Sequence, residues 1–229
     1  MKGSIVVASI VCLVSAQPCL ADDLSFNDFG PWNKGSAAGL GIFSTFNKLP
    51  TPINHMPNSG TASYSGATVG SLQNTLVLPP IATPPLTQVS NFAFTGSSSL
   101  STDFSNQTFT ATFQNFRSTN LASGGQMSGL PWVGLVRNSI TGSVTSIVYA
   151  GSINGNSLSG SLKSTDFTTG GNFIGTVTNN SSALNALFFG NKANSVAGTW
   201  QANATGSHDP CNGCLTTSQL NAAFAARKP

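Results

Sequence analysis

The chain has 229 residues and a formal net charge of +3, and only 7% of its residues are charged. This charge is too small for the dense basic patch of a nucleic-acid-binding protein or for a protein held on anionic membranes. All the acidic residues are aspartate, and Ser, Thr, Asn and Gly supply most of the polar surface. Such a composition is typical of exported proteins built from β-strands and turns.

Residues 1–21 are predicted to be a secretory signal peptide. Lys2 provides the basic start, an apolar run occupies residues 5–14, and small residues precede Asp22. The mature chain is therefore predicted to begin at Asp22 and to leave the cytoplasm. The residues ahead of Cys19 do not fit the cleavage pattern of a lipoprotein, so lipid anchoring is not expected.

The mature chain is predicted to form one domain. Residues 22–59 are irregular, with Gly and Pro between aromatic residues, and we expect them to lie against the main domain. Residues 60–229 are predicted to form that domain. No later apolar stretch approaches the roughly 20 residues that a membrane helix needs, so a membrane-spanning helix is not expected.

From Gly60 onward the dominant hydrophobic period is two, the spacing of strands that turn alternate side chains to opposite faces. Nine short segments carry this pattern: 61–69, 92–103, 108–116, 144–153, 157–163, 172–178, 183–189, 196–202 and 220–227. Allowing for mergers, they predict about eight strands, the number that closes a barrel filled by its own side chains. The predicted fold is all-β: an antiparallel up-and-down barrel with an irregular N-terminal segment.

The turn residues indicate local connections between these strands. Asn-Gly-Asn at 154–156, Ser-Asn at 105–106 and Gly-Gly at 170–171 tolerate the positive φ of tight hairpins. The proline-rich residues 79–85 and the glycine-rich residues 118–131 are predicted to be binding loops, because a barrel leaves its connections free to vary. An outer-membrane barrel is the rival fold, but it needs a lipid-facing apolar band that Ser, Asn and Gly interrupt here.

Three stretches resemble the barrel domains of the transferrin-binding protein B family. Residues 56–66, MPNSGTASYSG, are similar to the opening strand of these barrels, and residues 100–110, LSTDFSNQTFT, resemble their Val-Asp-Phe hairpin. Residues 187–200, LFFGNKANSVAGTW, resemble the Phe-Tyr-Gly signature before the last two strands, and residues 223–228 resemble the closing strand. The order and spacing agree over residues 56–228.

The sequence also departs from the family pattern. Asn191 stands where proline is usual, Ser195 stands where glutamate is usual, and a loop with two cysteines lies between the final strands. No separate handle domain of the size found in larger relatives is visible. The architectural residues remain, because Gly190 can end a strand, residues 191–195 can form one helical turn, and Trp200 can face inward.

The resemblance implies an exported, non-enzymatic binding protein of Gram-negative bacteria, secreted or at the cell surface, with the periplasm as the alternative location. It implies a role in haem or iron acquisition by ligand capture. Haem or an iron-carrying protein would be the ligand, and an outer-membrane receptor or an export helper a further partner. A surface protein that binds a host or neighbouring macromolecule is the alternative, and a passive structural module is the third. No nucleophile and base pair supports catalysis.

Two histidines and one tryptophan are the candidate ligand-binding residues. If the barrel carries haem, His55 or His208 is the expected axial ligand, because imidazole binds haem iron; the alternative is an exposed histidine with no ligand. Trp132 follows a proline in the glycine-rich loop and is a candidate exposed anchor, with core packing as the alternative. Tyr64 and Tyr149 lie within strand patterns and are expected to be packing residues.

Cys211 and Cys214 are the only cysteines left after signal removal. We predict a disulfide between them, because an exported pair meets oxidant and has no other partner. A redox pair is the first alternative, but it lacks the surrounding βαβ pattern. A zinc site with His208 and Asp209 is the second, with suitable ligand types but crowded spacing.

Overall fold

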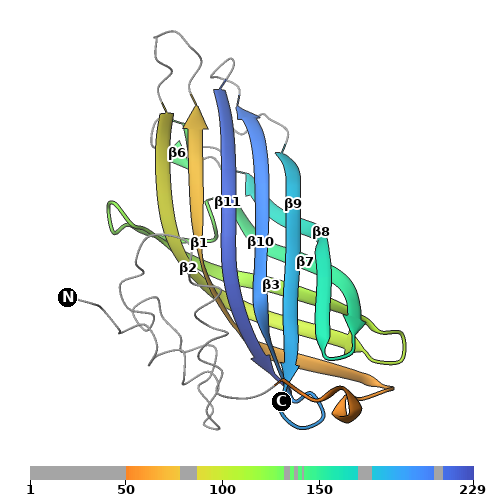
Figure 1. Cartoon of the computed structure of the whole chain (residues 1–229). Coiled ribbons are helices and arrows are strands. Elements are labelled where there is room, and N and C mark those ends of the chain that lie inside the picture. Colours follow the sequence, from red (N-terminus) through yellow and green to blue (C-terminus); the bar gives the residue numbers. More distant parts are fainter. Residues whose placement is uncertain are drawn as a thin grey trace, which may run out of the picture.

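The structure is a computed structural model that describes residues 50–77, 87–131, 135–136, 139–140, 142–169, 177–208 and 214–229. Within these ranges the chain is all-β apart from one short 3-10 helix, η3 (Ile53–His55). Eight antiparallel strands close into a barrel, which confirms the predicted fold class (Figure 1). The predicted signal peptide and residues 22–49 of the irregular segment lie outside the described ranges.

The barrel strands follow one another around the wall in chain order, so the topology is up-and-down. They are β1 (Thr61–Val77), β2 (Thr87–Asp103), β3 (Thr108–Asn120), β7 (Gly142–Asn154), β8 (Ser157–Thr169), β9 (Val177–Phe189), β10 (Ser195–His208) and β11 (Cys214–Arg227). Each strand pairs with the next, and β1 pairs with β11 to close the barrel. The short β4 (Gln126–Ser128) pairs with β3, and β5 (Leu135–Val136) pairs with β6 (Ser139–Ile140).

The strands are longer than the sequence pattern predicted. β1 has 17 residues, although its alternation suggested only residues 61–69. Residues 177–178 and 183–189, predicted in two separate strands, belong to the single strand β9. Both errors have the same cause: ladder hydrogen bonds to the neighbouring strands carry a strand through polar residues that hydrophobic periodicity does not recognise.

One end of the barrel, which we call the hairpin end, is built from short connections. These are residues 104–107, 155–156 and 190–194. Gly155 has a φ of +58°, which the two-residue loop requires and which confirms the hairpin predicted there. The turn predicted at 105–106 is also confirmed, whereas the Gly-Gly pair at 170–171 lies outside the described residues.

Residues 191–194 form a left-handed turn and not the helical turn that was predicted. Lys192 and Ala193 have φ values of +53° and +54°. The hydroxyl of Tyr64, on β1, donates a hydrogen bond of 2.7 Å to the Ala193 carbonyl. This contact joins residues that are 129 positions apart, so local sequence reasoning could not anticipate the turn. Gly190 ends β9 as predicted, with a φ of +76°.

Longer connections join the strand ends at the opposite end of the barrel, which we call the loop end. They are residues 78–86, 121–141, 170–176 and 209–213. The strands alternate in direction, so every second connection returns to the same end. In Figure 1 the loop end is at the top and the hairpin end, with the C-terminus, is at the bottom. Within the described ranges, no helix is long and apolar enough to cross a membrane.

Aromatic rings fill the hairpin half of the interior. Trp200 is 1% exposed, as predicted for an inward residue, and it stacks on Phe113 with ring centroids 4.7 Å apart. The Trp200 indole N–H donates a hydrogen bond of 3.0 Å to the Thr68 hydroxyl, so the polar edge of the ring is paired. Further rings contact this pair: Phe94, Phe116, Tyr149 and Phe224.

Candidate binding site at the loop end

The structure separates the sequence-predicted site residues between the two barrel ends. His208 and Cys214 form the last register pair of the β10–β11 hairpin, at the loop end. His55 precedes β1 and therefore lies at the hairpin end. The part of β1 that pairs with β11, Ser65 to Val77, spans about 40 Å at the usual rise per residue. The two histidines therefore cannot bind one ligand together.

Trp132, Asp209 and Cys211 lie outside the described residues. The disulfide between Cys211 and Cys214 therefore stays a prediction, and so do its redox and zinc alternatives. Within the described residues, no group of three His, Cys, Asp or Glu side chains is close enough to hold a metal ion.

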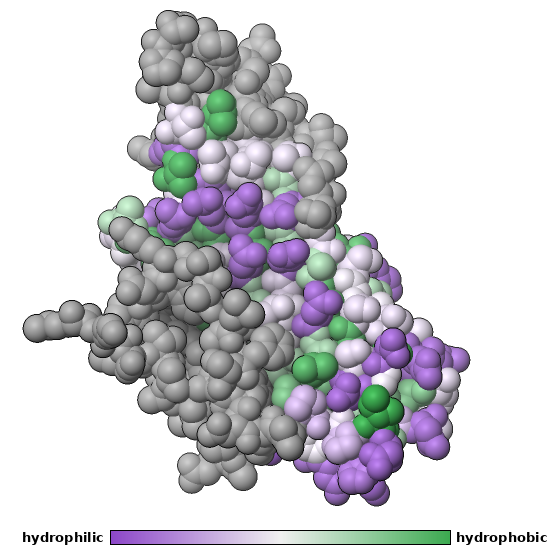
Figure 2. All heavy atoms as spheres, in the orientation of Figure 1, coloured by the Kyte–Doolittle hydropathy of each residue, from purple (hydrophilic) through white to green (hydrophobic). Residues whose placement is uncertain are grey.

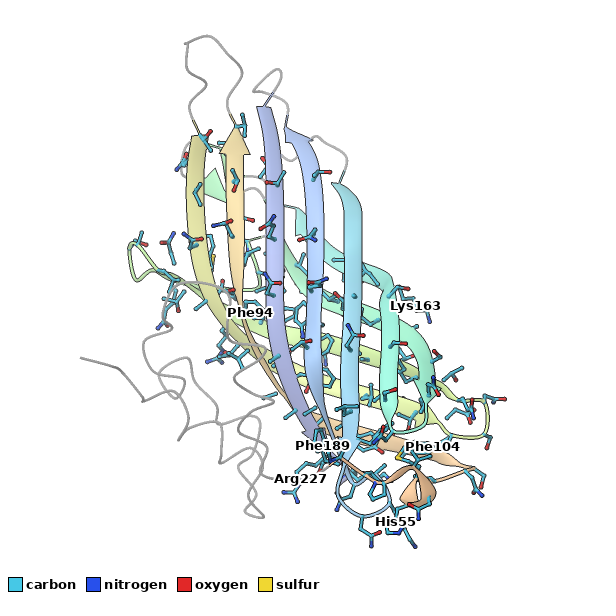
Figure 3. The ribbon with its side chains drawn as sticks, viewed as in Figure 1. His55, Phe94, Phe104, Lys163, Phe189 and Arg227 are labelled. Atoms are coloured by element: carbon cyan, nitrogen blue, oxygen red, sulfur yellow. The ribbon has the colours of Figure 1, made fainter. Side chains whose placement is uncertain are left out.

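The side chain of His55 is exposed, and η3 carries it outside the barrel (Figure 3). Its backbone N–H donates a hydrogen bond of 2.8 Å to the Pro52 carbonyl and closes the single turn of η3. Neighbouring Ile53 is also exposed, at 69%. If His55 binds a ligand, it does so on the outer surface and not over an open barrel mouth, because the barrel is closed at this end.

Lys228 closes the hairpin end. Its ammonium group donates a hydrogen bond of 3.0 Å to the Lys192 carbonyl and lies 5.5 Å and 5.7 Å from the ring centroids of Tyr64 and Phe104. Partial burial lowers the pKa of Lys228. The cation over two ring faces is a stabilising arrangement, and it places Lys228 over the rings at the hairpin end of the interior.

The two tyrosines are packing residues, as predicted. Tyr64 and Tyr149 are 2% and 0% exposed. The Tyr149 hydroxyl donates a hydrogen bond of 2.8 Å to the Gln201 carbonyl, as the Tyr64 hydroxyl does to the turn after β9. Burial raises the pKa of both phenols, which holds them in the neutral form. Both phenols are therefore enclosed in the barrel and hydrogen-bonded to backbone carbonyls.

The loop half of the interior has a different chemistry, centred on Asn74. This side chain is 1% exposed; its amide donates a hydrogen bond to the Pro131 carbonyl, and its oxygen accepts one of 2.5 Å from Ser218. Asn74 is on β1, whereas Pro131 belongs to the connection between β3 and β7. This connection therefore reaches across the interior, and residue 132 follows immediately after the anchored carbonyl.

The glycine-rich stretch 118–131 is only partly the free loop that was predicted. Its first residues belong to β3, residues 126–128 form β4, and Leu130 bridges to Val144 of β7 with hydrogen bonds of 3.1 Å and 2.8 Å. Direct β3–β7 pairing ends at Gln114, so this stretch fills the wall beyond that point. The stretch is held in the wall by backbone hydrogen bonds, which a pattern of hydrophobic residues cannot predict.

The wall between β8 and β9 also changes at mid-height. Pairing between these strands stops at Ser161 and Ala183, although both strands continue toward the loop end. Register shifts in the β7–β8 and β9–β10 pairs lie close to this point, and such bulges bend a strand away from its neighbour. Toward the loop end, β8 is therefore paired only with β7, and β9 only with β10.

Three hydroxyls in the loop half have no hydrogen-bond partner and no solvent contact within the described part of the chain. They belong to Thr165, Ser182 and Thr216. Register places Thr165 inward, opposite the buried Ile147, and places Thr216 inward, four residues from the buried Leu220 on the same strand. Ser182 lies at the register shift between β9 and β10. Sequence reasoning missed them; polar residues at inward positions were the only signal.

A family model described as the C-lobe and N-lobe beta barrels of Tf-binding protein B matches residues 56–228. Among solved structures, the chain is similar to intact Ap-TbpB with its N and C lobes, at 14% identity and a TM-score of 0.36, over 78% of this chain and 28% of that chain. A transferrin binding protein B mutant from Haemophilus parasuis Hp5 gives 12% identity and a TM-score of 0.34 over 78% and 28%. The chain thus spans less than a third of these structures. No curated protein matches significantly.

Proposed function

Because the chain belongs to the family of transferrin-binding protein B barrels, we propose that it is a bacterial binding protein of iron acquisition that captures an iron-carrying protein through its loop end. The observation that carries the proposal is the asymmetry of the barrel. The hairpin end has short turns and is covered by Lys228, and the strand ends at the other end are joined by four longer connections. A rigid wall that presents several loops together is the usual architecture of a binding surface.

A protein ligand suits this barrel better than a haem held inside it. The hairpin half of the interior is filled by Trp200, Phe113 and the rings around them. In the loop half, the Asn74–Pro131 hydrogen bond crosses the interior. Loops at a barrel end can instead contact a macromolecule over a wide surface, with an aromatic residue such as Trp132 as anchor. Haem capture at the same end, with His208 as the iron ligand, is the second form of the proposal.

The proposal includes the cellular setting expected from the sequence. The signal peptide at residues 1–21 directs export, the 22–59 segment precedes the barrel of residues 60–229, and the protein acts on the surface of a Gram-negative bacterium or after secretion. An outer-membrane receptor or an export helper is the expected further partner. The role is binding without catalysis, and the disulfide between Cys211 and Cys214 would stiffen the β10–β11 loop of the binding end.

Two titrations of the processed protein test this function. Binding to iron-loaded transferrins is measured by biolayer interferometry, and haem binding by the Soret absorbance. We expect transferrin binding that Trp132→Ala weakens at least tenfold, as for a buried aromatic anchor, and that His55→Ala leaves unchanged. A Soret shift lost in His208→Ala would establish the haem form instead. Binding of neither ligand at micromolar concentration would overturn the proposal.

A further inference from the structure

Six apolar residues are buried although they do not belong to the interior. Seven buried apolar residues are absent from the interior hydrophobic cluster, and one of them, Leu76, stands at an inward position of β1. The other six are at most 4% exposed: Ala67, Val69, Ala93, Phe189, Ala197 and Ala223. Each alternates along its strand with inward residues such as Thr68, Phe94 and Trp200, so each points outward. We call this surface the outer apolar face.

Five of these residues form a continuous surface across four neighbouring strands, β2, β1, β11 and β10, and Phe189 stands at its border on β9. In one cross-strand row Val69 lies between Thr95 and Ala223, and in the next row Ala67 and Ala197 both pair with Ala225. Three strand spacings give a width of about 14 Å. Toward the loop end a polar belt borders the face, where Gln73 donates a hydrogen bond of 3.1 Å to Asn91; Figure 2 shows hydrophilic residues at this level.

The opposite wall shows that burial of outward residues is not a general property of this barrel. The outward positions of β8 alternate with buried Leu158, and they are Ser159, Ser161 and Lys163. All three are exposed and polar. An alanine on the outside of a single-layered wall is as fully buried as Ala197, which is 0% exposed, only when another part of the chain lies over it.

The chain outside the described ranges ends beside this face. Pro50, the first described residue of the N-terminal part, bridges to Phe189, and the Thr51 N–H donates a hydrogen bond of 2.8 Å to the Phe188 carbonyl. Ahead of Pro50 stand residues 22–49, which in extended form reach about 90 Å and can cross the face several times. The segment is therefore long enough to cover the face, and it leads into Pro50 and Thr51, which are hydrogen-bonded at the border of the face.

The composition of residues 22–49 is complementary to the face. This stretch contains five large aromatic residues: Phe26, Phe29, Trp32, Phe43 and Phe46. Alanines on the barrel surface allow rings to approach the sheet closely, and burying each ring contributes about 1.5–3 kcal/mol in general. We propose that residues 22–49 of the processed chain dock as a strap on the outer apolar face of β1, β2, β10 and β11.

Limited proteolysis of the full processed chain tests the strap. Lys34 and Lys48 are its trypsin sites. We expect slow cleavage at both in the unaltered protein and at least tenfold faster cleavage in Ala223→Glu, because a carboxylate in the centre of the face opposes apolar docking. The matched control is Ser161→Glu on the opposite wall, which should leave the cleavage rate unchanged. Circular dichroism checks that both variants keep the barrel.

A second measurement keeps the test decisive if Ala223→Glu does not fold. Hydroxyl-radical footprinting of the unaltered protein should find Trp32 and Phe46 oxidised at least fivefold more slowly than in urea. Equal oxidation, or equal trypsin rates in all three proteins, would overturn the proposal. So would a dimer by light scattering that Ala223→Glu converts to a monomer, because the face would then be covered by a second copy of the chain.

Discussion

The two halves of the barrel are built on the same eight strands, but polar side chains are buried among the apolar ones in the loop half. In the hairpin half, aromatic rings stack and pair their polar edges, as Trp200 does with Thr68. In the loop half, the inward positions beyond Trp200 on β10 are Ala202 and Ala204, and buried hydroxyls stand without partners. We therefore expect stability to be concentrated at the hairpin end, which leaves the loop end free to carry the longer connections.

Removal of the Trp200 ring should destabilise the protein more than any other single change discussed below. Trp200→Ala removes the ring on which Phe113, Phe94 and Tyr149 converge, and it leaves a cavity in the best-packed region. We expect a loss of about 3–5 kcal/mol in the free energy of unfolding. Urea denaturation followed by circular dichroism measures it. A loss below about 1 kcal/mol would show that the hairpin half is not the stable half.

Alkaline pH should lower the free energy of unfolding through the two buried tyrosines. Burial raises the folded-state pKa of Tyr64 and Tyr149 above the ordinary value of 10.0. Above that value the unfolded chain releases protons that the folded chain retains, so stability is fully present below pH 10 and falls as the pH rises further. The slope is about 1.4 kcal/mol per pH unit for each phenol. Tyr149→Phe should roughly halve this slope, whereas an unchanged slope would contradict the assignment.

Particular residues show what the sequence could and could not predict. Alternation placed Trp200 inward, and the Asn-Gly-Asn turn placed a hairpin at Gly155, because both signals are local. Asn74 was missed, since a polar residue at an inward position contradicts the apolar pattern and is explained only by its contact with Pro131. The sequence could not place His55 and His208 at opposite ends of the barrel, because their positions depend on strand direction and register.

Asn74→Ala is expected to have an intermediate effect. It removes both acceptor and donor, so the Ser218 hydroxyl loses one partner and the Pro131 carbonyl loses its hydrogen bond from β1. We expect a loss of about 1–3 kcal/mol of unfolding free energy. If the anchored connection presents Trp132, ligand binding at the loop end should also weaken. A stability loss with unchanged binding would separate the network from the binding surface.

The smallest effect provides the sharpest comparison, because two threonines on neighbouring strands differ only in their partners. Thr68 and Thr216 are 0% and 1% exposed. The Thr68 hydroxyl donates a hydrogen bond of 2.8 Å to the Ala223 carbonyl and accepts one from Trp200, whereas the Thr216 hydroxyl has no partner in the described part of the chain. The isosteric change to valine removes two hydrogen bonds in one case and none in the other.

Thr68→Val should therefore lower the free energy of unfolding by about 1–3 kcal/mol. Thr216→Val should leave it unchanged or raise it by up to about 1 kcal/mol, because an unpaired buried hydroxyl is replaced by a methyl group of the same size. Parallel urea titrations of the two variants measure the difference. Equal destabilisation would mean that the Thr216 hydroxyl is hydrogen-bonded in solution, and the polar interior of the loop half would then be a stabilising network and not a site left open for function.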